Sequence, residues 1–275
     1  MKFRRIELLI VRTAQEIKDG EVVIIGQGIP MAAGAYAKKY LAPNCLLLTE
    51  AGMVDIDLFQ NLDDIGDPGA TKGFSYLCDL YDVFTEITYR GFADLCILGA
   101  GQIDKYGNVN STVIGDYNIN SRNDWRLPGA GGAPEFSAYA KRIVLTLSGG
   151  NLVEKLDYLT SPGWLTGEDA REKAGLPGGP TTVITTFGVF KFDEKTKEMY
   201  LAEVFPDTTI ELVKEKVPWN LKIADDLIVL EKPSKEDLDF IRWFDPLFGV
   251  GTNWGRQRMS SVLPRYFEEQ LKNSK

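Results

Sequence analysis

The stretch EVVIIGQGIPMAAGAYAKKYLAPNCLLLTEAG, residues 21–52, decides the fold class. Two continuous apolar runs, at 21–25 and 45–49, stand on either side of a segment that has the pattern of a helix starting at Pro30. Proline suits the first turn of a helix because the backbone N–H that it lacks would have no partner there. Apolar strands that alternate with helices predict a mainly parallel sheet covered on both faces.

The same alternation continues along the chain. A helix at 13–20 is predicted from a capping box between Thr13 and Glu16 and from Gly20 as its end. We therefore expect an α/β fold, one domain over 1–275, built on an open, mainly parallel sheet with helices on both faces. Beyond about residue 251 the apolar periodicity is lost, which predicts a C-terminal arm. The other predicted strands are 93–101, 142–147, 181–192 and 197–205, and the other predicted helices are 30–42, 209–217 and 235–244.

The composition excludes several classes of function. The net charge of −8 argues against nucleic acid or an anionic membrane as a partner, because both require a basic face. No signal peptide or transmembrane run is visible, which predicts a cytoplasmic protein. The chain has no histidine, so Ser-His-Asp and Cys-His catalysis and imidazole metal sites are excluded. Cys45, Cys78 and Cys96 are far apart in the sequence and are expected to be reduced.

Three glycine-containing turns follow predicted strands, after Ile25, Thr49 and Leu98. The carboxyl ends of parallel strands lie at one edge of a sheet, where ligands of such folds bind. We therefore expect the three turns to share one rim. Their sequences are GQG at 26–28, EAG at 50–52 and GAG at 99–101.

Glu50 is the acidic residue of these turns. A carboxylate at the end of an apolar strand is either a surface residue or a functional group presented to a substrate, and the residues alone leave both interpretations open. In the functional interpretation Glu50 acts as a nucleophile or as a base. Its small neighbours Ala51 and Gly52 would then leave space for the substrate.

Two glycine-rich loops are candidates for anion or oxyanion binding. In LPGAGGA, residues 127–133, successive amides of Gly131 and Gly132, or of Gly132 and Ala133, could point at one oxygen atom. A flexible surface loop would have the same composition. The turn at 26–28 could present backbone N–H groups to an anion, or could be a tight turn and no more.

Taken together and in this order, these stretches resemble the β subunit of the family I coenzyme A transferases, most closely the glutaconate CoA-transferase type. The resemblance covers about residues 10–245. Its matching segments are DGEVVIIGQGIP (19–30), LLLTEAGMVD (46–55), GAGQIDKYGNVNSTVIGDY (99–117), LPGAGGA (127–133), DYLTSPGW (157–164) and VFKFDEKTKEMYLAEVFP (189–206).

The resemblance implies a fold of the CoA-transferase type and an obligatory α subunit. The active site would lie between the subunits of an (αβ)2 or (αβ)4 assembly, and the CoA thioester would be a substrate, with no permanently bound cofactor and no metal. Glu50 matches the catalytic glutamate of the family. The remaining implied site residues are Gly131, Gly132, Ala133 and Gly101 for the oxyanion and CoA, and Gly26, Gln27 and Gly28 for the substrate.

The family reaction moves CoA from an acyl thioester to a free carboxylate, in ping-pong order, through a glutamyl-CoA thioester on Glu50. A carboxylate can attack without a proton shuttle, which agrees with the absence of histidine. Three alternatives stay open: a ring-cleavage acyl-CoA hydrolase or a decarboxylase on the same fold, a non-catalytic partner subunit, and a sugar-phosphate isomerase. The isomerase requires basic phosphate ligands, which the rim turns almost entirely lack. The acyl group is not specified by this chain.

Overall fold

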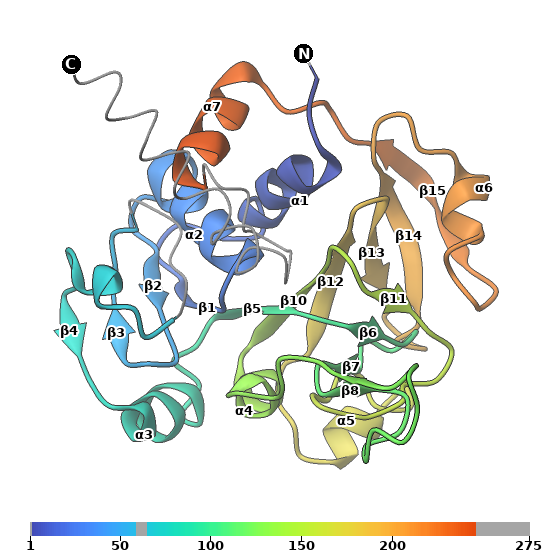
Figure 1. Cartoon of the computed structure of the whole chain (residues 1–275), viewed down its shortest axis with the longest axis horizontal. Coiled ribbons are helices and arrows are strands. Elements are labelled where there is room, and N and C mark those ends of the chain that lie inside the picture. Colours follow the sequence, from blue (N-terminus) through green and yellow to red (C-terminus); the bar gives the residue numbers. More distant parts are fainter. Residues whose placement is uncertain (1, 59–64, 246–275) are drawn as a thin grey trace.

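The computed structural model describes residues 2–58 and 65–245 (Figure 1). A ten-stranded sheet runs through it in the order β15-β14-β13-β12-β10-β5-β1-β2-β3-β4. Its middle strands run parallel to one another, as predicted. They are β2 (Leu46–Leu48), β1 (Val22–Ile25), β5 (Leu95–Gly99), β10 (Arg142–Leu147) and β12 (Pro180–Thr185). The sheet stays open, with no closure into a barrel.

Antiparallel pairs extend the sheet at both ends, except that the outermost strand on one side, Lys222–Val229, is parallel to its neighbour. On one side the predicted apolar run at 181–192 folds back on itself as a hairpin, because β12 pairs antiparallel with β13. Strand β15 and the short strands on the other side were not predicted, because they are polar or only two residues long. The added strands are β13 (Gly188–Phe192), β14 (Met199–Val204) and β15 (Lys222–Val229), and β3 (Met53–Val54) and β4 (Tyr76–Leu77).

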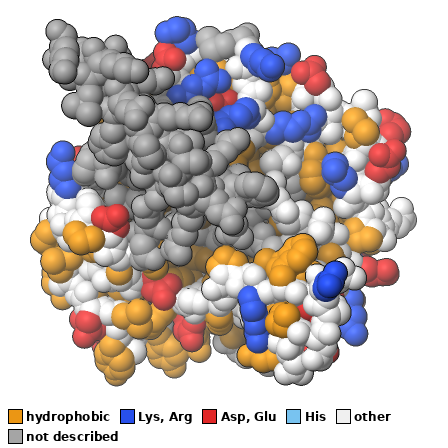
Figure 2. Space-filling model, in the orientation of Figure 1, with side chains coloured by type: hydrophobic (Ala, Val, Ile, Leu, Met, Phe, Trp, Pro, Cys, Tyr) orange, Lys and Arg blue, Asp and Glu red, His pale blue; other side chains and the backbone are white. Residues whose placement is uncertain are grey.

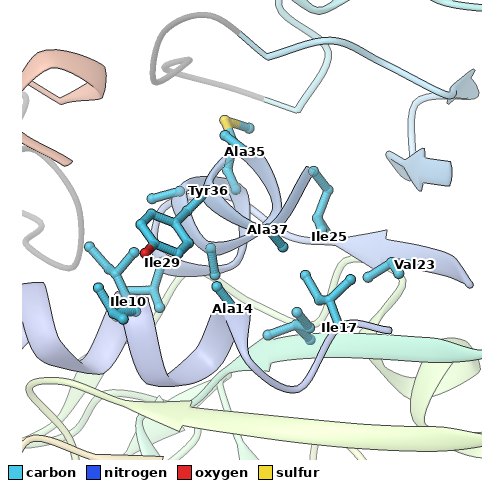
Figure 3. Packing of buried hydrophobic residues seen from close by; sticks show 14 of the residues in the cluster. Ile10, Ala14, Ile17, Val23, Ile25, Ile29, Ala35, Tyr36 and Ala37 are labelled. Atoms are coloured by element: carbon cyan, nitrogen blue, oxygen red, sulfur yellow. The ribbon is translucent and has the colours of Figure 1, made fainter. Parts of the chain in front are cut away.

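Helices cover both faces of the sheet. Side chains alternate along each strand, so Val23 and Ile25 enter one core while Ile24, between them, enters the other. The first core packs against α1 (Arg5–Ala14), α2 (Ile29–Tyr40) and α7 (Lys235–Phe244), and Figure 3 shows part of it. The second core packs against the π-helix η2 (Val83–Thr88), α4 (Ala133–Tyr139) and α6 (Ile210–Lys214).

Short elements fill the connections. Three further strands form a small sheet in the order β11-β6-β7, and β8 pairs with β9 in a hairpin. The elements are β6 (Gln102–Ile103), β7 (Val109–Asn110), β8 (Val113–Ile114), β9 (Trp125–Arg126) and β11 (Asn151–Leu152), with η1 (Pro68–Thr71), α3 (Leu80–Asp82) and α5 (Ala170–Lys173).

The predicted helix at 13–20 is wrong. The chain is helical earlier, in α1, and Thr13 lies buried near its end with its hydroxyl donating to the Leu9 carbonyl at 2.7 Å. The carboxylate that closes a capping box is that of Glu7, which accepts the Arg4 N–H at 2.7 Å. The Thr13–Glu16 pattern was misleading because burial of the apolar residues before Thr13 decides where the helix lies.

The other predicted helices are present in α2, α6 and α7. The predicted arm at 251–275 lies outside the described residues, and the single-domain organisation stays a prediction. No helix within 2–58 and 65–245 is long and apolar enough to cross a membrane.

A buried carboxylate joins the first and last helices. Glu7, on α1, is 1% exposed and accepts Arg242 Nε, from α7, at 2.9 Å. Burial alone would raise the pKa of Glu7, but the hydrogen bonds from Arg242 and from the Arg4 backbone outweigh it and lower the pKa below 4.5. The ionised form is therefore stabilised by folding.

We expect Glu7→Gln to lower the free energy of unfolding by about 1–3 kcal/mol at neutral pH, because the charged hydrogen bond is lost. Since the folded pKa is lowered, the contribution is complete above pH 4.5 and disappears as the pH falls through the folded value. Urea unfolding of both chains across this range measures the difference. An equal difference at every pH would assign the loss to packing instead.

Candidate active site

The three glycine-containing turns share one rim, as predicted. Strand β1 lies between β2 and β5 and is parallel to both, with Val23 opposite Leu47 on one side and Leu95 on the other. All three strands therefore end at the same edge of the sheet.

Glu50 lies at the tip of a hairpin between β2 and β3. The Thr49 N–H donates to the Met53 carbonyl at 3.1 Å, and the Gly52 N–H donates to the Thr49 carbonyl at 3.1 Å. These bonds fix the backbone on both sides of Glu50, whose side chain is partly exposed.

Gly52 is small for a different reason from the one predicted. It is buried with φ of +90°, and a Cβ atom built on it would lie 1.9 Å from the Cys78 carbonyl oxygen. The Cys78 N–H in turn donates to the Gly52 carbonyl at 2.9 Å. The missing side chain makes room for the chain's own backbone rather than for a substrate.

The glycine-rich loop meets Glu50 across 82 positions of sequence. The Gly132 N–H donates to Glu50 Oε2 at 2.9 Å. At Gly131, with φ of +49°, a Cβ atom would lie 3.4 Å from the same oxygen. Ala133 starts α4 directly after them. The loop whose amides were predicted to bind one oxygen atom thus lies next to Glu50, the candidate nucleophile.

Two aromatic rings fix the position of Gly132. Phe84, on η2, and Phe136, on α4, have ring centroids 5.1 Å apart. A Cβ atom at Gly132 would lie 2.6 Å from the Phe84 ring and 2.8 Å from the Phe136 ring. Only glycine therefore allows the backbone amide to come this close to both rings. The sequence carries no motif that marks these phenylalanines.

The polar loop before β8 holds the glycine-rich loop from the other side. The Gly129 N–H donates to the Ser111 carbonyl at 2.9 Å, and the Ser111 hydroxyl donates to the Gly129 carbonyl at 2.9 Å. The Leu127 N–H donates to the Thr112 carbonyl at 3.0 Å. The loop containing Gly131 and Gly132 is thus anchored rather than a free surface loop.

The other predicted site glycines have structural contacts of their own. The Gly101 N–H donates to the Asn110 carbonyl at 2.9 Å, so this amide is engaged within the small sheet. In the 26–28 turn, Gly28 has φ of +81° and precedes α2, and Gln27 is exposed on the rim. Contact of these residues with a substrate stays a prediction.

Arg171 holds α4 in place through hydrogen bonds to its backbone. The sequence did not predict this role. Arg171 is 1% exposed, and its guanidinium donates only to backbone carbonyls among the described contacts. Two of them, Ser137 and Ala138 at 2.6 and 3.2 Å, belong to α4, the helix that follows Gly132. Burial lowers the pKa of Arg171 to about 10, so the side chain stays charged at neutral pH. The other acceptors are the carbonyls of Pro162, Gly163, Pro177 and Gly178.

Two thiols lie near this chemistry, those of Cys96 and Cys78, and burial raises the pKa of both. Cys96 is fully buried in β5, and burial together with the negative charge of Glu50 raises its pKa. A buried, protonated thiol is a poor nucleophile, which leaves Glu50 as the candidate. In the part of the chain that the structure describes, no group of acidic or cysteine residues could hold a metal ion.

Residues 6–216 match the family model described as Coenzyme A transferase. The chain belongs to this family. It is 34% identical to the β subunit of glutaconate CoA-transferase of Acidaminococcus fermentans, over 86% of this chain and 90% of the relative. It is 33% identical to the β subunit of 3-oxoadipate CoA-transferase of Pseudomonas knackmussii, over 86% of this chain and 91% of the relative.

The fold agrees with this assignment. The crystal structure of glutaconate CoA-transferase from Acidaminococcus fermentans superposes with a TM-score of 0.82 at 32% identity, over 91% of this chain and 98% of that chain. Both sequence relatives are β subunits, so the chain is a β-subunit-type member of the coenzyme A transferase family.

Proposed function

We propose that this CoA-transferase chain carries the nucleophile of a hetero-oligomeric enzyme that moves CoA between an acyl-CoA thioester and a carboxylic acid. Glu50 would carry CoA as a glutamyl thioester between the two half-reactions. The observation that supports this most strongly is the 2.9 Å hydrogen bond from the Gly132 N–H to Glu50 Oε2. It joins a partly exposed carboxylate to a fixed amide donor, which are the two groups that acyl transfer to a side chain requires.

The proposed reaction proceeds by successive nucleophilic substitutions at carbonyl carbons. The Glu50 carboxylate attacks the thioester carbonyl, the C–S bond breaks, and a mixed anhydride and CoA thiolate form. The thiolate attacks the glutamyl carbonyl and releases the first carboxylic acid as its anion, leaving the glutamyl-CoA thioester. The acceptor carboxylate then attacks that thioester, and the same two steps in reverse give the new acyl-CoA and free Glu50. No step requires a proton donor, which suits a chain without histidine.

The Gly132 amide has a specific place in this sequence. In the resting chain it donates to a Glu50 carboxylate oxygen. When that carboxyl group becomes the anhydride or the thioester, the same oxygen becomes the glutamyl carbonyl oxygen. Each attack on the glutamyl carbon places negative charge on this oxygen, where the amide already points. An amide so placed contributes about 3 kcal/mol to transition-state stabilisation.

The substrates and the partner follow from the relatives by analogy. Glutaconate and 3-oxoadipate are both dicarboxylic acids, so we propose a dicarboxylic acyl group. A β subunit implies a companion α subunit, which would complete the acyl pocket. CoA enters as a substrate, and no permanently bound cofactor takes part.

The requirement for an acceptor acid tests transfer against hydrolysis. The chain is combined with the α subunit of the same organism, and glutaconyl-CoA or 3-oxoadipyl-CoA is supplied with and without acetate. Transfer predicts that free dicarboxylic acid reaches at most one equivalent per Glu50 until acetate is added, and that acetyl-CoA then accumulates. Continuous release of free acid without acetate would show a hydrolase that uses water instead.

The space beside Glu50 gives a matched pair of variants. Gly131→Ala places a methyl group about 3.4 Å from Glu50 Oε2, in a backbone conformation that L-residues rarely adopt. We expect the kcat of the two-subunit enzyme to fall about 10- to 100-fold, because the strained backbone shifts the loop and moves the Gly132 amide away from the Glu50 carboxylate. The control is Gly20→Ala, before β1 and at the opposite end of that strand from the rim, where φ is also positive, at +79°, and a Cβ atom meets open space. Steady-state kinetics that showed equal kcat for both variants would contradict the placement of Glu50.

A further inference from the structure

A face of exposed apolar side chains lies at one end of the main sheet. Within 74–92 there are seven of the eighteen large hydrophobic residues that are exposed in the described part of the chain. Four of them, Tyr76 and Leu77 on β4 and Leu80 and Tyr81 on α3, define what we call the β4–α3 face. Figure 2 shows apolar side chains gathered at the left and lower left of the molecule, over β4 and α3 as placed in Figure 1.

This face has the features of an interface rather than of a solvated surface. β4 is the last strand of the ten-stranded sheet, so its outer edge has no neighbouring strand within the described residues. Neighbouring side chains point to opposite faces of a strand, yet Tyr76 is 58% exposed and Leu77 is 47% exposed. Tyr81 is 69% exposed. Soluble proteins usually protect such edges with charges or a covering element.

The β4–α3 face is continuous with the candidate active site. Cys78 lies within it in sequence, and its N–H donates to the carbonyl of Gly52, two positions after Glu50. Phe84, on η2 directly after α3, packs against Gly132, whose amide donates to Glu50. A protein that covered the β4–α3 face would therefore lie close to Glu50.

We infer that the β4–α3 face binds the companion α subunit, an inference that rests on the proposed function. A second copy of this chain fits less well. In a two-fold dimer the face would meet itself, and Asp79 and Asp82 would be brought toward their own copies. A different protein can instead offer apolar pockets flanked by lysine and arginine. Such a partner would also lie close to Glu50, where the acyl pocket of the proposed reaction must form.

Two charge-introducing double variants test the face. Leu80→Glu with Tyr81→Glu alters side chains that are exposed on α3. The control, Ile228→Glu with Val229→Glu, makes the same change on β15 at the opposite edge of the sheet, where these side chains are 54% and 64% exposed. Each full-length chain is titrated with the α subunit of the same organism in analytical ultracentrifugation, and thermal unfolding of each chain alone shows whether it folds.

We expect the α3 variant to fold normally and to bind the α subunit at least about 100-fold more weakly, while the β15 control binds as the unchanged chain does. Unchanged binding by the α3 variant would overturn the inference. If the unchanged chain alone formed a dimer that the α3 variant lost, the face would bind a second copy instead.

A second measurement needs no substitution. Hydrogen exchange of the unchanged chain, alone and in the complex, should show protection of 74–92 by the α subunit, and lack of protection there would also overturn the inference. Glu50→Gln separates this result from the proposed function. That variant should assemble with the α subunit and be inactive. If it assembles and is active, the proposed chemistry fails while the interface stands.

Discussion

Glu50→Gln is expected to lower the rate of CoA transfer by the two-subunit enzyme by about 10⁴-fold or more. Glutamine keeps the size of the side chain and an oxygen that can accept the Gly132 N–H. It cannot form the anhydride, because a neutral amide is not a nucleophile toward a thioester. The loss should therefore appear in kcat, with binding of the acyl-CoA nearly unchanged. Initial rates over a range of acyl-CoA and acceptor concentrations measure this.

Glu50→Asp gives a second, informative variant. It keeps the carboxylate but withdraws it from the Gly132 amide by one methylene. We expect partial activity, lower than that of the unchanged chain and higher than that of Glu50→Gln. Full activity of Glu50→Gln in the same assay would remove this chain from the chemistry and support a non-catalytic role.

Gly52→Ala is expected to destabilise the chain by about 3–5 kcal/mol. The new methyl carbon would have to occupy a position 1.9 Å from the Cys78 carbonyl oxygen, in a backbone conformation with φ of +90°. Either the β2–β3 hairpin or the segment around Cys78 must then move. Urea unfolding of the chain alone measures the loss.

Gly91→Ala is the matched control for Gly52→Ala. Its φ is +76°, but a Cβ atom there has no neighbour within 4 Å. The control should lose only about 1–2 kcal/mol, which is the cost of the left-handed conformation. Equal losses for the two variants would mean that the close approach of Cys78 contributes nothing.

The rim could be predicted from the sequence because it follows from parallel strands. Continuous apolar runs joined by a helix identify strands buried on both faces, and their carboxyl ends must lie together. This placed the turns after Ile25, Thr49 and Leu98 on one edge, where β1, β2 and β5 now end.

The contact between Glu50 and Gly132 could not be predicted from pattern alone. No periodicity relates two loops 82 positions apart, and only the resemblance to the CoA-transferases assigned both residues to one site. The structural roles of individual residues were harder still to predict. A glycine at position 52 looks the same in the sequence whether it makes room for a substrate or for the Cys78 carbonyl. Arg171 lies in the charged run AREK, which is typical of an exposed helix, although it is buried under α4.

The capping box at Thr13 shows where a local signal fails. Its residues satisfy the helix-start pattern, but the apolar residues of α1 before them bury against the first core and extend the helix in the other direction. Tertiary packing outweighs a capping preference, which is worth about 1 kcal/mol.

The proposed function depends on the covalent attachment of CoA to Glu50. It is tested most directly by incubating the two-subunit enzyme with acyl-CoA and no acceptor, reducing with borohydride, and measuring the mass of the peptide that contains Glu50. We expect this peptide to lose one oxygen atom and gain two hydrogen atoms, because borohydride reduces a thioester to an alcohol, and we expect activity to be lost in parallel. An unmodified Glu50 peptide from enzyme that has turned over its acyl-CoA would contradict the proposed function.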